Sequence, residues 1–295
     1  MQKILIIGSG DVARRILPHL AGRYRVFALL RNAARAKDWR ADGVQPLIAD
    51  LDERCSLDRI AGLADVVLHL APPPNQGLVD LRTKHLLAAL GKGKSLPRRL
   101  IYVSTTGVYG DCGGALIDET RRLNAESPRA ARRIDAEQTL RAWGRRNGVK
   151  VSILRAPGIY AADRLPLERL EKGLPALLAA DDVFTNHIHA EDLAAACVAA
   201  IRHGAANRAY NAVDDSDLKM ADYFDQVADA FACPRAPRLS RTAAAALLSP
   251  MQMSFMRESR RIANRRIKQE LKLRLAFPSV SDGIADAVKG HALCS

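Results

Sequence analysis

The sequence predicts an α/β protein built on a doubly wound parallel sheet. Short, continuous apolar runs alternate with stretches of helical pattern, which is typical of a series of βαβ units. The runs lack alternating polar residues, as expected for parallel strands that are covered on both faces. A glycine motif follows the first run and opens the first helical stretch. Together these observations indicate a nucleotide-binding sheet.

Each predicted strand is an apolar run rich in Val, Ile and Leu. In chain order the runs are 3–8 (KILIIG), 25–30 (RVFALL), 44–49 (VQPLIA), 65–71 (DVVLHLA), 99–105 (RLIYVST), 149–156 (VKVSILRA) and 209–213 (AYNAV). The predicted helices lie between them, near 11–22, 33–41, 56–63 and 77–91, through 136–146 (AEQTLRAWGRR), and at 190–204, where an Ala-rich stretch ends in glycine. Parallel strands need such crossovers, so helices should cover both faces of the sheet.

Composition excludes several classes of function. The net charge of +13 invites a nucleic-acid partner, but the 34 Arg and 11 Lys are scattered along the chain and only 5% of residues are aromatic. Arg-rich solvated faces explain the charge, and we expect no nucleic-acid partner. No apolar run reaches the roughly 18 residues of a membrane span, so no membrane partner is expected. Five widely spaced cysteines without a CxxC pair favour a reducing cytoplasm and no metal site.

The glycine motif GSGDVA follows the first predicted strand directly. Gly8 suits a tight turn, Gly10 lets backbone approach a pyrophosphate, and Ala13 allows close packing of helix on strand. We therefore predict a dinucleotide site of the Rossmann type, the alternative being a glycine-softened turn without a ligand. The predicted cofactor-binding residues are Gly8, Ser9, Gly10, Asp11, Val12, Arg31, Asp50, Leu51, Leu70, Ala71, Arg133, Ala156 and Pro157.

The end of the second predicted strand favours NADP as the cofactor, with NAD as the alternative. An acid is expected there when a free ribose 2′-hydroxyl is bound, but the chain has Arg31 and Asn32, with Arg35 close behind. Cations suit a 2′-phosphate, unless Arg31 is simply a solvated residue. Asp50, after the third strand, is a candidate partner of the adenine amine, or alternatively a cap of the next helix.

Six motifs in order resemble the extended and atypical short-chain dehydrogenase/reductases, the NAD-dependent epimerase/dehydratase group. The segments are VVLHLA, RLIYVSTTGVYGD, ILRAPGIY, NHIHAEDLA, YNAVDD and the C-terminal SRRIANRRIKQELKLRLAFPSVSDGI. The resemblance is nearly end to end. It implies an NAD(P)-dependent oxidoreductase or epimerase that acts on a small hydroxyl or carbonyl compound, with a nucleotide-activated sugar as one candidate substrate.

The resemblance also implies a catalytic set, and here the chain departs from the family. Thr105 matches the residue that hydrogen-bonds the reacting oxygen, although a threonine there could instead satisfy backbone. Counting back from Glu137 places Arg129 at the catalytic tyrosine position and Arg133 at the lysine position of YxxxK. Arg133 can keep a ribose contact, whereas Arg129 has no neutral form to move a proton. Tyr109 is then the leading acid/base candidate and Tyr160 the next, unless Tyr109 only packs.

For two histidine-containing segments we prefer a structural role over a functional one. His189 and Asp192 stand three residues apart at a predicted helix start, which favours a structural cap over a metal site. His69 lies on an apolar strand and is expected to be a core residue.

The expected organisation is a Rossmann domain over 1–213, whose loop 157–186 contributes to the substrate side, followed by a smaller, mostly helical region over 214–295. Two hypotheses from different classes remain: an enzyme, and a non-catalytic dinucleotide sensor that kept the fold and lost the tyrosine. The sequence does not give the substrate or the oligomeric state, and a homodimer remains open.

Overall fold

The computed structural model describes residues 1–292, and Cys294 lies outside them. Its centre is a seven-stranded parallel sheet with the strand order β12-β7-β5-β4-β1-β2-β3. The strands are β1 (Gln2–Ile7), β2 (Tyr24–Leu30), β3 (Gln45–Ile48), β4 (Val66–His69), β5 (Arg99–Thr105), β7 (Lys150–Ala156) and β12 (Arg208–Asn211). All seven predicted strands are therefore present, and the doubly wound α/β fold is confirmed.

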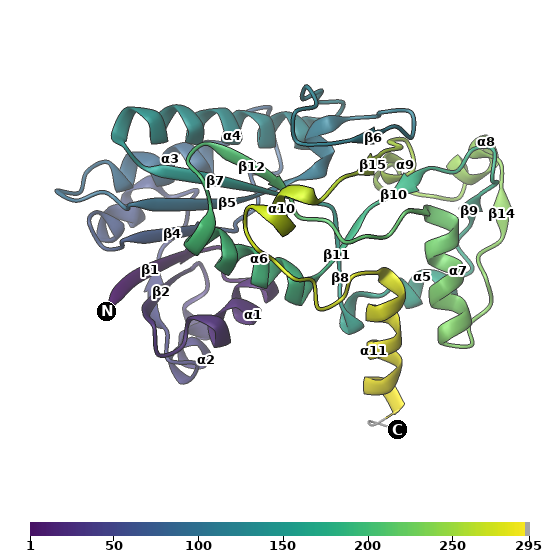
Figure 1. The fold of residues 1–295 in the computed structure, drawn as a ribbon, viewed down its shortest axis with the longest axis horizontal. Coiled ribbons are helices and arrows are strands. Elements are labelled where there is room, and N and C mark those ends of the chain that lie inside the picture. Colours follow the sequence, from purple (N-terminus) through teal and green to yellow (C-terminus); the bar gives the residue numbers. More distant parts are fainter. Residues whose placement is uncertain (293–295) are drawn as a thin grey trace.

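Helices cover both faces of this sheet (Figure 1). One face packs against α1 (Asp11–Leu20), α2 (Ala36–Ala41) and α6 (Ala190–His203), and the other against η2 (Arg54–Ile60), α3 (Leu81–Leu90) and α4 (Pro128–Asn147). Ile4 and Ile6 face the first layer, whereas Leu5 and Ile7 face the second. This explains why the strands read as unbroken apolar runs.

Several helices differ from their predicted bounds for local reasons. The helix expected at 77–91 begins only at Leu81, because the Asp80 carboxylate accepts a hydrogen bond from the Thr83 amide and caps it there. The stretch 33–41 is a short 3₁₀ turn, η1 (Ala33–Arg35), followed by α2. The segment expected to be helical at 56–63 is the 3₁₀ helix η2.

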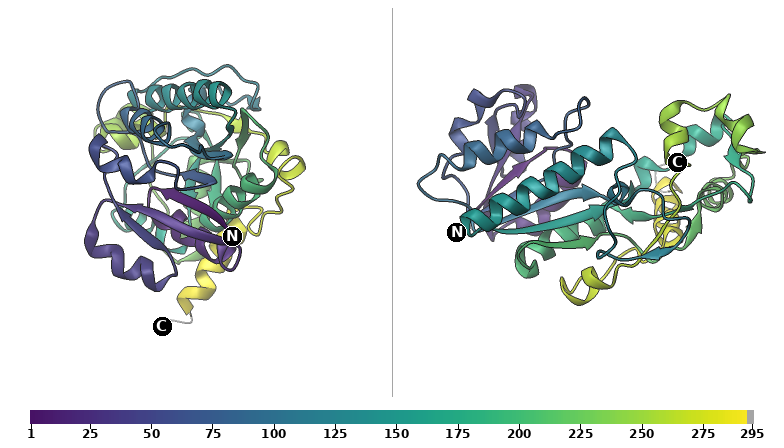
Figure 2. Two further views of the ribbon diagram at one scale, coloured as in Figure 1. Left: turned by 90° about the vertical axis from the view of Figure 1, so that its left-hand side faces the viewer. Right: turned by 90° about the horizontal axis from the view of Figure 1, so that it is seen from above.

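Most of the remaining elements form a second part beyond one end of the sheet (Figure 1; Figure 2, right). Its helical pieces are η3 (Thr106–Tyr109), η4 (Ala162–Arg164), α5 (Leu167–Glu171), α7 (Met220–Ala230), α8 (Arg241–Ala245), α9 (Pro250–Phe255) and α11 (Val280–Ala292). Its short strands are β6 (Leu116–Ile117), β8 (Gly158–Tyr160), β9 (Ala176–Leu177), β10 (Phe184–Thr185), β11 (His187–His189), β13 (Leu218–Lys219), β14 (Arg238–Leu239) and β15 (Arg261–Ile262). The helix α10 (Arg265–Gln269) packs instead beside the edge strand β12 of the sheet.

This second part has its own apolar core, drawn from two stretches of the chain. Tyr160, Leu170 and Leu177 pack there with Phe224 and Ile284, so the segment after β7 does associate with the C-terminal helices. The C-terminal region is not wholly separate, however, because Ile267 and Leu271 of the α10 region join the core of the sheet. The boundary at 213/214 stays a prediction. None of the described helices is both long and apolar enough to cross a membrane.

Two cavities at the candidate active site

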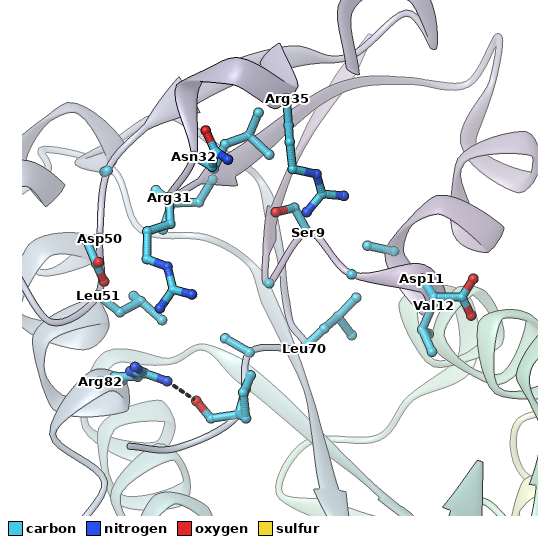
Figure 3. Close-up of a pocket in the computed structure, with 18 of the residues that line it drawn as sticks. Ser9, Asp11, Val12, Arg31, Asn32, Arg35, Asp50, Leu51, Leu70 and Arg82 are labelled. Carbon is cyan, nitrogen blue, oxygen red and sulfur yellow. Dashed lines mark hydrogen bonds between the residues drawn. The ribbon is translucent and has the colours of Figure 1, made fainter. Parts of the chain in front are cut away.

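A cavity of about 410 Å³ opens where the first four strands end, and we call it the N-terminal cavity (Figure 3). Its lining comes from the turn after β1, the ends of β2 and β3, the segment after β4, and two arginines from further along the chain. The lining residues are Gly8, Ser9, Gly10, Asp11, Val12, Ala13, Leu29, Leu30, Arg31, Asn32, Arg35, Ala49, Asp50, Leu51, Leu70, Ala71, Pro72, Arg82 and Arg164. Ten of the thirteen predicted cofactor-binding residues lie together here.

The glycine turn has the geometry that a dinucleotide needs. Gly8 has φ +98°, and a Cβ there would lie 2.4 Å from the Ala71 backbone nitrogen, so only glycine fits between the ends of β1 and β4. A Cβ on Gly10 would meet no atom within 4 Å, so this backbone borders open space. Ala13 is fully buried. The Gly10 backbone at the start of α1 is therefore accessible to a pyrophosphate, and the glycine turn fits this group.

Arginines surround the end of the cavity where β2 stops. Arg31 and Arg35 point into it, and neither guanidinium has a hydrogen-bond or ion-pair partner among residues 1–292 (Figure 3). Asn32 is used locally, because its Oδ1 accepts a hydrogen bond from the Ala34 amide at 2.9 Å. Two unpaired cations at the strand end suit an anionic group better than a neutral ribose hydroxyl pair.

Asp50 and Leu51 line the same end, next to a residue that sequence reasoning missed. The Asp50 Oδ1 accepts from the Asp52 amide at 3.0 Å, whereas the helix η2 starts after Glu53, so Asp50 closes a turn and does not cap that helix. Arg82 of α3 binds Asp52 through two hydrogen bonds of 2.7 and 2.5 Å. No sequence pattern indicates Arg82, because its helix α3 comes next to the cavity only when the chain folds.

A second cavity of about 710 Å³ lies beyond β5 and β7, and we call it the C-terminal cavity. Its charged lining residues are Arg129, Arg164, Arg169, Arg260 and Glu258, so cations outnumber acids four to one. Its apolar and aromatic lining comes mainly from the second part of the molecule: Tyr160, Phe184, Met220, Tyr223, Phe224, Met251, Phe255 and Met256. Arg164 lines both cavities and is the one described residue common to the two linings.

Thr105 lies at the end of β5 and lines the C-terminal cavity, as a residue that contacts substrate must. Its Oγ1 accepts a hydrogen bond from the Gly107 amide at 3.2 Å, so the threonine also satisfies backbone. Both interpretations of Thr105 are thus compatible with its position. Pro157 lines the same cavity, whereas Ala156 is buried and lines neither cavity.

Tyr109 does not reach either cavity, and the geometry gives no support to its predicted acid/base role. It is 1% exposed, its hydroxyl donates to the Asn211 Oδ1 at 2.6 Å, and it accepts from Arg155 at 2.9 Å. Arg155 in turn forms a buried ion pair with Glu137 at 2.7 Å. Burial raises the pKa of Tyr109, and the Arg155 charge opposes the rise. Tyr109 therefore occupies the packing position that was the alternative.

Arg129 and Arg133 are separated by the structure. Arg129 lines the C-terminal cavity, where its guanidinium has no hydrogen-bond or ion-pair partner among the described residues. Arg133 is buried and donates to the Tyr102 hydroxyl and to the Val103 carbonyl, each at 2.9 Å. Arg133 lines neither cavity, so its guanidinium is not placed for the expected contact with the nicotinamide ribose. Its charge favours the Tyr102 phenolate, but burial prevails and raises the pKa of Tyr102 to about 12.

His187 is a lining residue that sequence reasoning did not single out. It is 6% exposed, packs on the Tyr223 ring at 4.3 Å between centroids, and its Nδ1 has no hydrogen-bond partner. Burial lowers the pKa of His187 to about 4, so the imidazole is neutral near pH 7. The neighbouring Tyr160 donates its hydroxyl hydrogen bond to the Ser279 carbonyl at 3.1 Å. The segment NHIHAEDLA contains two histidines, but nothing in its sequence indicates which of them lines the cavity.

His189, Asp192 and His69 have structural roles. His189 Nδ1 accepts from the Glu191 amide at 3.3 Å and caps α6. The Asp192 carboxylate accepts from the amides of Ala276 and Phe277 at 2.7 and 2.9 Å, which anchors the C-terminal segment. His69 lies in the core, where its Nε2 is hydrogen-bonded to Thr83 at 2.9 Å. These contacts support the cap and core interpretations.

The fold and the first cavity define a dinucleotide-binding protein of the Rossmann class. The chain belongs to the NAD dependent epimerase/dehydratase family, whose model matches residues 4–212. It is 25% identical over 245 residues to GDP-6-deoxy-D-mannose reductase of Pseudomonas aeruginosa, covering 77% of this chain and 80% of that protein. The predicted family is confirmed, and with it an NAD(P)-dependent enzyme type.

Two solved structures share the fold over nearly the whole chain. UDP-glucose 4-epimerase of Thermotoga maritima, solved with UDP-glucose, has a TM-score of 0.79 at 16% identity and covers 99% of each chain. The dTDP-glucose 4,6-dehydratase DesIV of Streptomyces venezuelae, solved with NAD, has a TM-score of 0.79 at 21% identity and covers 99% of this chain and 97% of that chain. At these identities the likeness shows the fold alone.

Proposed function

We propose that the protein is an NADP(H)-dependent oxidoreductase or epimerase-like enzyme acting on a small hydroxyl or carbonyl compound that carries an anionic group. The observation that carries this proposal is that Arg164 borders two cavities, one lined by the glycine turn and the other by Thr105 and Arg129. The names of the relatives, a GDP-deoxysugar reductase and a UDP-glucose epimerase, favour a nucleotide-activated sugar.

The N-terminal cavity is assigned to the dinucleotide, which supplies or accepts a hydride when bound. Gly10 and the start of α1 would hold the pyrophosphate, and Arg31 with Arg35 would hold a 2′-phosphate. NADP is preferred over NAD in this proposal, because no acid at the end of β2 is available for a free 2′-hydroxyl.

The C-terminal cavity is assigned to the substrate. Thr105 would hydrogen-bond the reacting oxygen, and Arg129 would bind the anionic group. Arg129 remains charged even though partial burial and the charges of Arg133 and Arg132 lower its pKa, so it cannot replace a tyrosine as proton donor. His187 is a neutral imidazole near pH 7, and its Nδ1 has no hydrogen-bond partner among the described residues, so it would hydrogen-bond a substrate hydroxyl without taking its proton.

The test is an activity assay with a panel of nucleotide-activated keto sugars and small keto acids, each paired with a neutral analogue. Turnover is measured as the rate at which NADPH is consumed. The expected result is turnover that favours the anionic compounds, with Arg129→Gln raising their KM by at least about tenfold, the loss of one charge-assisted hydrogen bond. Arg145→Gln is the matched control, because Arg145 is an exposed residue of the same helix and lines neither cavity. Equal turnover of the anionic compounds and their neutral analogues would reject the proposal that the substrate is recognised through an anionic group.

A dinucleotide sensor is the second candidate, and the arginine at position 129 is the observation that favours it. The resemblance puts the catalytic tyrosine at this position, and Tyr109 does not replace it in the cavity. The sensor hypothesis expects NADP binding without turnover for the wild type and for Arg129→Tyr. Turnover by either protein would reject it.

A further inference from the structure

Asp11 poses an electrostatic problem in the N-terminal cavity. It is the acidic residue in the first turn of α1 and lines the cavity at the position where a pyrophosphate would approach. A carboxylate there is favoured by the helix dipole as long as no ligand is present, but it repels a bound anion. The residues paired with Asp11 therefore decide how well an anion binds.

Two arginines share the Asp11 carboxylate. Arg15 Nε lies 2.8 Å and Arg164 Nη2 lies 3.0 Å from the same oxygen, Asp11 Oδ2. Arg15 is held from two other sides as well, by Glu191 at 2.6 Å and by Asp163 at 3.5 Å. For Arg164, Asp11 is the one side-chain partner among the described residues. Arg164 is thus the cation that can leave Asp11 at the smaller cost.

Arg164 is also part of the substrate side of the molecule. It ends η4, which follows β8, and the residues on either side of it, from Pro157 to Tyr160 and at Arg169, line the C-terminal cavity. Arg164 lines both cavities. A change of partner by this guanidinium would therefore act on the wall of the substrate cavity.

We propose that Arg164 couples the two cavities: it pairs with Asp11 in the free protein and binds the dinucleotide pyrophosphate in the complex, which fixes segment 158–169 against the substrate cavity. The inference rests on the proposed dinucleotide site and adds a positioning residue that the glycine motif does not contain.

Calorimetric titration with NADPH of the wild type, Arg164→Gln, Asp11→Asn and the double variant tests the coupling. Arg164→Gln should weaken binding by about tenfold to a hundredfold, since one charge-assisted contact is lost and Asp11 keeps only Arg15. Asp11→Asn should bind as tightly as the wild type or tighter, and in its background Arg164→Gln should cost a smaller factor. Arg14→Gln, on the same helix but paired with Asp38 and Asp42, is the control.

Hydrogen exchange provides a readout that does not depend on affinity. At saturating NADPH, the amides of segment 158–169 should become protected in the wild type and in Arg14→Gln, but less so in Arg164→Gln, with thermal melts showing that all variants are folded. Unchanged affinity of Arg164→Gln, or equal protection in all variants, would overturn the coupling while the dinucleotide site stands. A wild type that fails to bind NADPH would overturn both.

Discussion

The two cavities are built in different ways, and the difference explains how far each could be foreseen. The N-terminal cavity is lined by turns that directly follow β1, β2, β3 and β4, with Arg82 and Arg164 as the additions from elsewhere. The C-terminal cavity collects short pieces from residue 105 to residue 260. A site made at strand ends follows from the order of strands alone. A site made from distant loops depends on how the second part packs.

The largest expected effect concerns the glycine turn and sharpens the contrast between the cavities. Gly10→Val should abolish NADPH binding while the protein still folds, because the side chain would enter space free of protein atoms within 4 Å of the Cβ. Gly8→Ala should instead destabilise the fold by roughly 1–3 kcal/mol or more, since its Cβ would overlap Ala71. Fluorescence titration and thermal melts separate the two. Binding retained by a folded Gly10→Val would refute the pyrophosphate position.

The next effect concerns Thr105 in the C-terminal cavity. With a substrate from the panel, Thr105→Ala should lower turnover by about 10²–10⁴-fold, the range for a lost catalytic group, whereas Thr105→Ser should keep most of it. NADPH affinity should not change, because Thr105 lines only the substrate cavity. A Thr105→Ala enzyme with wild-type turnover would assign the residue to backbone support alone, through its contact with the Gly107 amide.

The next effect concerns the preference of the N-terminal cavity for NADPH over NADH. Arg31→Ala should reduce the preference for NADPH over NADH by about tenfold to a hundredfold, as one charge-assisted hydrogen bond to a 2′-phosphate is lost. Arg40→Ala, an exposed residue of α2 outside the cavity, should leave the ratio unchanged. Affinity ratios from parallel titrations measure the effect. Equal affinities in the wild type would contradict the NADP assignment.

The last prediction concerns the free energy of unfolding as a function of pH. Burial lowers the pKa of His69 to about 3 and that of His187 to about 4, whereas both are about 6.5 in the unfolded chain. The contribution of these two histidines to the free energy of unfolding is therefore fully present above about pH 6.5, and it is lost as the pH falls from about 6.5 towards 3. Burial raises the pKa of Asp214 to about 7, so its contribution has the opposite sign and is lost as the pH rises from about 4 to 7.

Urea unfolding between pH 4 and 6.5 checks these signs. His69→Gln and His187→Gln should each flatten the acid loss, by at most about 1.4 kcal/mol per pH unit. Asp214→Asn should steepen it. Unchanged slopes in both histidine variants would mean that these imidazoles titrate normally in the folded state.

Local patterns predicted most of the fold and little of the substrate cavity. Apolar runs located the seven strands, and the glycine turn together with the ends of the second, third and fourth strands located ten cavity residues, because these features depend on neighbours in the sequence. Tyr109 and Arg133 were assigned by position in a motif, yet both side chains are turned inward, toward Asn211 and toward Tyr102. Arg164 and His187 reach the cavities through contacts between segments far apart in the chain, which no local pattern encodes.

Hydride transfer between the two cavities can be followed with NADPH in which both C4 hydrogens are replaced by deuterium, so that transfer from either face is detected. The wild type is incubated with the panel of anionic carbonyl compounds, and the products are analysed by mass spectrometry. We expect deuterium in the reduced product of at least one compound, and loss of that label in Gly10→Val and Thr105→Ala. A protein that binds NADPH but transfers deuterium to no member of the panel, and that epimerises no nucleotide-activated sugar with NADP⁺, would contradict the enzyme assignment and favour the sensor.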